Sequence, residues 1–185
     1  MTLSEAVARI VNSQVNELVE RCVKSNETRH YFDIAMIGYG EEAYSAWNGA
    51  LEGRDFVTPE EIRDNPFLKK MVKEEVRTRK GVTIKEVEKK QWMTARHDGS
   101  WTRMDKAFKR AEGLLDTWMR QHHDKDCYPP TIINITDGEY NGVSHDEMLQ
   151  LANQLKSMFT NDGNVLLFNI HIVPNHAEAV VFPAT

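Results

Sequence analysis

The chain contains only two cysteines, no apolar run long enough to cross a bilayer and no excess of basic charge. Cys22 and Cys127 lie far apart and in no metal-ligand spacing, so the sequence indicates neither a disulfide framework nor a zinc site. A membrane-spanning helix would need roughly 20 consecutive apolar residues. The net charge of −5 argues against nucleic acid as the main partner. We therefore expect neither a membrane nor a nucleic acid as partner.

The N-terminus also lacks the basic patch and apolar core of a secretory signal. The sequence therefore predicts a cytoplasmic protein with reduced thiols. With 185 residues, 41% of them hydrophobic and 28% charged, the composition is that of an ordinary soluble globular protein. This length predicts a single domain over residues 1–185.

Helical periodicity is clear in three segments. Thr2 and Glu5 form a capping-box pattern before a helix that runs to Cys22. An apolar stripe from Met104 to Trp118 predicts a second long helix that ends near Gln121. A second capping box begins at Ser144 and predicts a third helix. Thr58 and Pro59 indicate a further, short helix start.

Apolar runs between these helices predict strands. The run over residues 31–40 suits a buried strand, as do residues 131–136 and 165–173. Residues 44–57 are interpreted as an edge strand or hairpin, and residues 67–93 as either a charged helix or a hairpin, of which the hairpin is favoured. Because strands alternate with amphipathic helices, the fold class is α/β: an open, mostly parallel, doubly wound sheet with an inserted β-hairpin.

The most informative stretch is residues 131–139, an apolar run that ends in Thr-Asp-Gly-Glu. Ligands bind open parallel sheets at the carboxyl ends of the strands. Asp137 is therefore the best candidate in the chain for a cation ligand or an acidic reactive group. For an isolated Asp-Gly pair, a simple turn would be the more common interpretation.

Two motifs together resemble the second half of a von Willebrand factor type A (VWA) domain of the bacterial intracellular kind: residues 98–104 (Asp-Gly-Ser-Trp-Thr-Arg-Met) and residues 129–139. The resemblance implies a metal-ion-dependent adhesion site that holds a divalent cation, Mg²⁺ or Mn²⁺, at the top of the sheet. It assigns Thr102 and Asp137 as metal ligands. Ser100, Trp101 and Glu139 become candidate contacts for a partner protein, whose acidic side chain would complete the coordination of the cation.

The sequence departs from the VWA pattern at its start. That family carries an Asp-x-Ser-x-Ser motif on a strand before the first helix, and here the helix begins at residue 2 or 3. The resemblance therefore implies a metal site that is incomplete, weak or absent, and a sheet with unpaired edges. Three explanations stay open: the chain is truncated at the N-terminus, and at the C-terminus too; another chain supplies the strand by swapping or oligomerisation; or the two flanking strands pair directly.

The resemblance favours a protein–protein interaction module and not an enzyme. One alternative is a Mg²⁺-dependent phosphoryl-transfer or hydrolase enzyme that uses Asp137. Another is a metal-independent scaffold or oligomerisation domain. The sequence identifies neither the partner nor the pathway.

Overall fold

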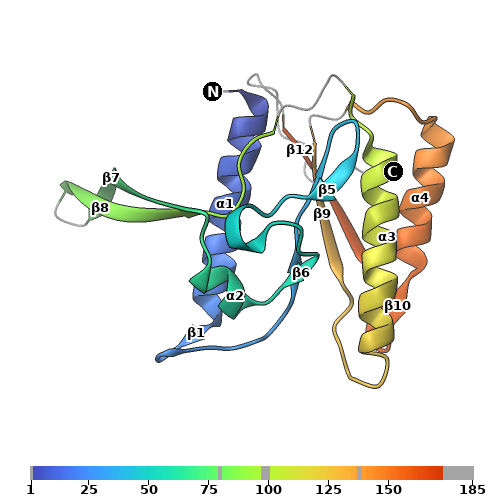
Figure 1. Cartoon of the computed structure of the whole chain (residues 1–185), viewed down its shortest axis with the longest axis horizontal. Helices are drawn as coiled ribbons and strands as arrows, with labels where there is room; N and C mark the ends of the chain where they lie inside the picture. Colours follow the sequence, from blue (N-terminus) through green and yellow to red (C-terminus); the bar gives the residue numbers. More distant parts are fainter. Residues whose placement is uncertain (1, 79–80, 97–100, 137–138, 173–185) are drawn as a thin grey trace. The chain divides into compact units, whose positions relative to one another are not determined.

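A computed structural model of the chain describes residues 2–78, 81–96, 101–136 and 139–172 (Figure 1). These residues cluster into two compact units. Unit 1 comprises residues 1–38 and 43–97, and unit 2 comprises residues 39–42 and 98–185. The chain is of mixed α/β type, with four α-helices and several small sheets in the described residues. The broad fold class expected from the sequence is therefore confirmed.

The first helix of unit 1, α1 (Leu3–Cys22), begins where the sequence predicts. The Thr2 hydroxyl accepts a hydrogen bond from the backbone N–H of Glu5, and the Glu5 carboxylate accepts one from the N–H of Thr2. This reciprocal capping box satisfies two N–H groups that a helix start otherwise leaves unpaired. The short helix α2 (Pro59–Asp64) uses the same device, with Thr58 as its N-cap and Glu61 as its partner.

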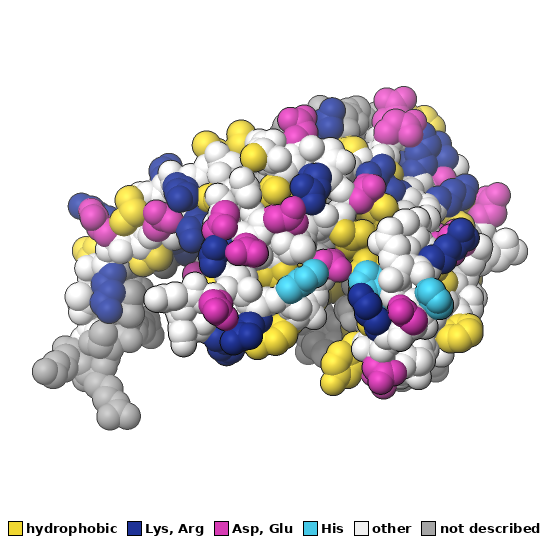
Figure 2. Space-filling view, turned by 60° about the horizontal axis from the view of Figure 1, so that its bottom comes forward, with side chains coloured by type: hydrophobic (Ala, Val, Ile, Leu, Met, Phe, Trp, Pro, Cys, Tyr) yellow, Lys and Arg dark blue, Asp and Glu magenta, His cyan; other side chains and the backbone are white. Residues whose placement is uncertain are grey.

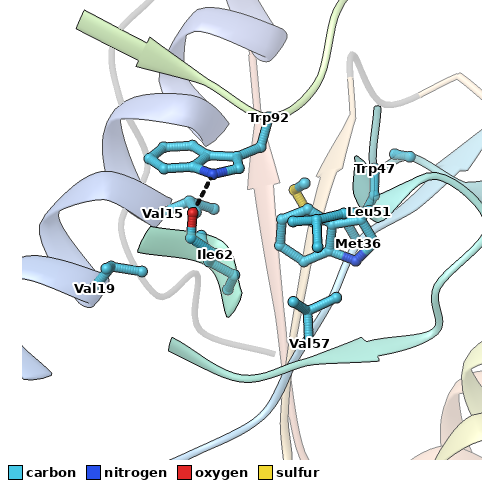
Figure 3. Packing of buried hydrophobic residues seen from close by; sticks show 9 residues of the cluster. Val15, Val19, Met36, Trp47, Leu51, Val57, Ile62 and Trp92 are labelled. Carbon is cyan, nitrogen blue, oxygen red and sulfur yellow. Dashed lines mark hydrogen bonds between the residues drawn. The ribbon is translucent and has the colours of Figure 1, made fainter. Parts of the chain in front are cut away.

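Two buried tryptophans form the centre of unit 1 (Figure 3). Trp47 follows the strand β5 (Ala43–Ser45), and Trp92 directly follows the strand β8 (Gly81–Gln91). The Trp92 indole N–H donates to the carbonyl oxygen of Ile62 at 2.6 Å. The remaining buried members come from α1, α2, the short strands and the segments beside them: Val15, Val19, Met36, Ala46, Leu51, Val57 and Ile62.

The apolar run at residues 31–40 is not one buried strand, so that expectation is wrong. It forms β3 (Ile34–Ala35) and β4 (Ile37–Tyr39), both only half-buried. The two strands are separated by Met36, whose side chain is buried and whose carbonyl accepts a hydrogen bond from the N–H of Ala46 at 2.9 Å. The strand β3 pairs antiparallel with β6 (Phe56–Val57), and β4 is a neighbour of β5. The remaining short elements are the hairpin β1 (Val23–Lys24) and β2 (Glu27–Thr28), and the 3-10 turn η1 (Gly49–Leu51).

A long antiparallel ribbon extends from unit 1 (Figure 1). The strands β7 (Leu68–Thr78) and β8 (Gly81–Gln91) form eleven cross-strand pairs, from Leu68↔Gln91 to Thr78↔Gly81. The hairpin favoured for residues 67–93 is therefore confirmed, and it is longer than expected. We refer to β7 and β8 together as the ribbon.

Unit 2 contains α3 (Met104–Gln121), β9 (Thr131–Thr136), α4 (His145–Ser157) and β12 (Leu166–His171). The hairpin of β10 (Phe159–Thr160) and β11 (Gly163–Asn164) turns at residues 161–162. The Ser144 hydroxyl caps α4 and accepts from the N–H of Glu147, as predicted. The strands β9 and β12 are parallel and joined through α4.

The two faces of the β9–β12 pair differ. Asn134 and Asn169 are paired in register and share one face, where the Asn134 amide also contacts the Met104 sulfur of α3. Side chains alternate between faces along a strand. The opposite face therefore carries Ile133, Leu166, Phe168 and Ile170, which are 43% to 58% exposed. The expectation that both strands are buried on both faces is thus wrong for this face.

Candidate functional site

The structure describes three of the five residues assigned to the site. Thr102 is half-buried, and Trp101 and Glu139 are exposed, Trp101 by 50%. The other two, Ser100 and Asp137, lie outside the described residues. The described residues of this region all belong to unit 2.

Thr102 is bound to the loop that follows β9. The backbone N–H of Thr102 donates to the Asn141 side-chain carbonyl at 2.8 Å, and the backbone N–H of Asn141 donates to the carbonyl of Thr102 at 3.1 Å. These two hydrogen bonds involve the backbone N–H and carbonyl of Thr102 and not its side-chain hydroxyl. The loop before α3 and the loop after β9 therefore meet at one end of unit 2, as an α/β fold with a site at the carboxyl end of its strands requires.

An ion pair at the start of α3 stabilises this meeting point. The guanidinium of Arg103 donates to both carboxylate oxygens of Asp105, at 2.8 and 2.9 Å. Asp105 is almost fully buried, and the hydrogen bonds from Arg103 hold its pKa below the usual range for a carboxyl. A Cβ at Gly142 would lie 2.7 Å from the Arg103 side chain, at a φ of +78°. A side chain at Gly142 is therefore disfavoured both by its contact and by its backbone conformation.

The loop of residues 39–42 joins the same end of unit 2. The carbonyl of Gly40 accepts a hydrogen bond from the N–H of Arg103 at 2.9 Å. The ammonium of Lys106 donates to the carbonyl of Glu41 at 3.0 Å and also forms an ion pair with Glu42. The phenol of Tyr39 donates to Asn134 at 2.9 Å. Three loops, residues 39–42, 101–103 and 139–142, thus converge, and we call this convergence the loop end.

A chain of polar side chains, of which Asn134 is buried, Tyr39 half-buried and Asn169 exposed, links the loop end to both strands. Tyr39 donates to Asn134, and the amide of Asn134 donates to the Asn169 side chain at 3.0 Å. Networks of this kind rigidify a site when every member is satisfied. Thr102 and Trp101 were predicted as site residues from the sequence, whereas the roles of Tyr39, Asn134 and Asn141 in holding the loop end together were not. The polar Asn134 inside an otherwise apolar strand was the one signal in the sequence that could have indicated its role.

The described residues of the loop end offer oxygen atoms, the type of ligand that a hard cation prefers, but too few of them to fill its coordination sphere. Thr102 offers a hydroxyl, and Mg²⁺ prefers six oxygen ligands. Within the described residues, no group of three or more His, Cys, Asp or Glu side chains is arranged to hold a metal ion. The described part of the loop end therefore does not make a complete metal site.

Comparison of the chain with family models, curated proteins and solved structures finds no match. Among the described helices, none combines the length and the apolar character that a membrane span requires. Cys22, which is buried, and Cys127, which is half-buried, are both free thiols.

Proposed function

We propose that unit 2 is a protein–protein interaction module of VWA type that binds its partner at the loop end. The observation that carries this proposal is the reciprocal pair of hydrogen bonds between Thr102 and Asn141. Asp137 directly follows the last residue of β9 in the sequence and precedes Asn141 by one short loop. Asn141, which follows Asp137 by four positions in the sequence, is thus bound to Thr102.

The wider sheet is also part of the proposal. The parallel β9–α4–β12 unit is the building block of open, doubly wound sheets. We propose that β9 lies beside a further parallel strand in the functional protein. Such a strand would extend the sheet and bring a third loop to the same end.

Thr102 and Asp137 would contribute two of the oxygens around a Mg²⁺ or Mn²⁺ ion. Mg²⁺ usually retains several waters and binds through one or two carboxylates. A bound cation would supply an open coordination position for a carboxylate of the partner protein. The exposed side chains of Trp101 and Glu139 lie on the two loops that flank this position in the sequence, and exposed aromatic residues often anchor partners.

The decisive experiment is a calorimetric titration of the purified protein with Mg²⁺ and Mn²⁺. Asp137→Asn and Thr102→Val each remove one candidate ligand atom, and the valine keeps the backbone groups of Thr102 that bind Asn141. We expect weak cation binding in the native protein and its loss in both variants. Thr131→Val is the matched control, because Thr131 is an exposed threonine at the opposite end of β9.

Each other result selects a different function. Cation binding that is unchanged in both Asp137→Asn and Thr102→Val would refute the proposed ligands. A native protein that binds no cation would favour a metal-independent scaffold. Hydrolysis of p-nitrophenyl phosphate that disappears in Asp137→Asn would favour the phosphoryl-transfer or hydrolase alternative.

A further inference from the structure

Several apolar side chains of the ribbon are exposed to solvent, although the ribbon is a sheet of only two strands. It is anchored at its base, where the N–H of Phe67 donates to the carbonyl of Gln91 at 2.8 Å and where β8 contacts α1. Leu68, Met71, Val82 and Ile84 are 46% to 66% exposed. A two-stranded hairpin alone is marginally stable in water. A surface that covers the ribbon would therefore stabilise it.

The ribbon is also basic, although the chain as a whole is acidic. Residues 68–91 contain nine Lys or Arg and four Glu, a net charge of +5, whereas the whole chain carries −5. Basic, acidic and hydrophobic side chains lie together at the left end of Figure 2, where Figure 1 places the ribbon. The ribbon is thus a basic region in a chain whose net charge is negative.

The positive charge is concentrated at the base of the ribbon. Lys69 lies opposite Lys90, and Lys70 lies opposite Lys89, so that two successive cross-strand pairs have like charges. Like charges directly opposite each other destabilise a sheet. Further along the ribbon the pattern changes, because Lys73 lies opposite Glu86. Because side chains alternate between faces along a strand, the two pairs lie on opposite faces of the ribbon, and an acidic surface against one face would relieve the repulsion of the pair on that face.

Unit 1 itself carries an acidic surface of this kind. The segment of residues 52–64, which we call the acidic segment, contains five Asp or Glu and two Arg. Both arginines already form ion pairs inside the segment, Arg54 with Glu61 at 2.8 Å and Arg63 with Asp64 at 2.6 Å. The acidic residues Glu52 and Glu60 are exposed. The acidic segment therefore presents surplus negative charge to solvent.

Two carboxyl groups of the acidic segment, those of Glu61 and Asp64, have a lowered pKa. The hydrogen bond from the Thr58 N–H, together with Arg54, lowers the pKa of Glu61. The hydrogen bonds from Arg63 lower the pKa of Asp64. The charge contrast between the ribbon and the acidic segment therefore persists throughout the neutral range.

We propose that two copies of this chain form a reciprocal dimer in which the ribbon of each copy lies on the acidic segment of the other. One two-fold axis satisfies both contacts, because each copy supplies one basic and one acidic surface. Eleven residues per strand give the ribbon a reach of about 37 Å. This association does not depend on the proposed cation site, since both surfaces belong to unit 1.

Sedimentation velocity of the native protein and of the Lys69→Glu/Lys70→Glu variant tests the proposal. In this variant each new carboxylate faces a lysine across the ribbon, so the ribbon itself gains favourable pairs while the surplus of positive charge is lost. We expect the native protein to be a dimer at about 0.02 M salt and to dissociate at about 0.5 M, where screening is strong. We expect the variant to dimerise at least about tenfold more weakly.

A charge-swap experiment makes the test specific. Glu52→Lys/Glu60→Lys reverses the acidic segment, and alone it should abolish the dimer. Mixed with the Lys69→Glu/Lys70→Glu variant it should form a heterodimer, because the native ribbon of one variant (+5) then meets the native acidic segment of the other (−3), while the two altered surfaces (+1 each) meet only each other. Lys125→Glu/Lys156→Glu is the matched control: it changes the net charge equally, at exposed lysines of unit 2, and should leave the dimer unchanged.

Three results would overturn the proposal. The first is a native protein that is monomeric at low salt, whether or not the ribbon binds nucleic acid or an acidic protein. The second is a dimer that is indifferent to reversal of Lys69 and Lys70. The third is the failure of the two reversed variants to associate when mixed. In the first case the edge lysines would serve only to discourage strand pairing.

Discussion

Unit 1 and unit 2 use polar groups in their interiors in different ways. In unit 1 the buried Asn12 serves the backbone: its carbonyl oxygen accepts from the N–H of Trp92 at 2.7 Å and its amide donates to the carbonyl of Met93 at 2.9 Å. In unit 2 the buried Asp105 and Asn134 bind other side chains, Arg103 and Tyr39 among them. Buried polar groups thus join secondary-structure elements in unit 1 and fix the loop end in unit 2.

The apolar surfaces of the two units differ as well. The core of unit 1 encloses two tryptophans, whereas the β9–β12 pair of unit 2 leaves one apolar face exposed. Buried aromatic side chains remove a large apolar area from water, so the enclosed core of unit 1 contributes more to stability than the exposed face of the β9–β12 pair does. Both units have a buried apolar core, that of unit 1 around two tryptophans and that of unit 2 around smaller side chains such as Phe108, Leu115 and Leu155.

The largest expected effect is on the core of unit 1. Trp92→Ala removes a fully buried indole and leaves the carbonyl of Ile62 without its donor. We expect a loss of about 3–5 kcal/mol in the free energy of unfolding, measured by urea denaturation. The control is Trp101→Ala, which removes a half-exposed indole and should cost less than about 0.5 kcal/mol. Equal losses in the two variants would contradict the role of Trp92 in the core.

A smaller effect is expected at the ion pair of unit 2. Asp105→Asn should lower the free energy of unfolding by about 1–3 kcal/mol at neutral pH, because the Arg103 guanidinium loses its charged partner. The pKa of Asp105 is lowered in the folded state, so its contribution is present above the unfolded pKa of about 3.9 and is lost as the pH falls through the folded value.

Urea denaturation of the native protein and of Asp105→Asn between pH 2 and pH 7, a range that brackets the usual carboxyl pKa of about 3.9, checks this sign. The difference between the two proteins should shrink as the medium becomes more acidic. A difference that stays constant with pH would mean that the carboxylate charge of Asp105 does not stabilise unit 2. Trp92→Ala provides the contrast, since no change of protonation at that position contributes to its effect.

The smallest expected effect on stability is on the exposed face of the β9–β12 pair. Phe168 is 43% exposed, so Phe168→Gln should change the free energy of unfolding by less than about 1 kcal/mol. It should, however, reduce self-association, because it interrupts a contiguous apolar patch. Light scattering as a function of concentration measures this. Val57→Thr, at a fully buried position of unit 1, should instead destabilise without changing self-association.

Local signals in the sequence predicted much of the fold. Thr2, Thr58 and Ser144 were identified as N-caps, and each makes the expected reciprocal hydrogen bonds. Capping is predictable because it involves residues three positions apart. The strand at residues 131–136 has the predicted bounds, and the hairpin at residues 67–93 forms as favoured. The VWA resemblance, the protein partner and the metal stay predictions.

The features that were missed all depend on contacts between residues far apart in the chain. Asn12 meets Trp92 across 80 positions, and Tyr39 meets Asn134 across 95. Periodicity in a short window contains no information about such pairs. The run at residues 31–40 was misinterpreted for the same reason, since the hydrogen bond to Ala46, which ties down the backbone at Met36, is non-local.

The anchoring of the ribbon at one end has a consequence for its motions. Trp92 fixes the base of β8 through the Asn12 and Ile62 contacts, and the pairs towards Thr78↔Gly81 lie farthest along the ribbon from this anchor. The backbone amides of the ribbon should therefore exchange with solvent deuterium along a gradient, slowest beside Gln91 and fastest towards Gly81. Because Trp92 lies where this gradient begins, its fluorescence should change when the base of the ribbon detaches from α1 and α2. It should not change when only the far end of the ribbon frays.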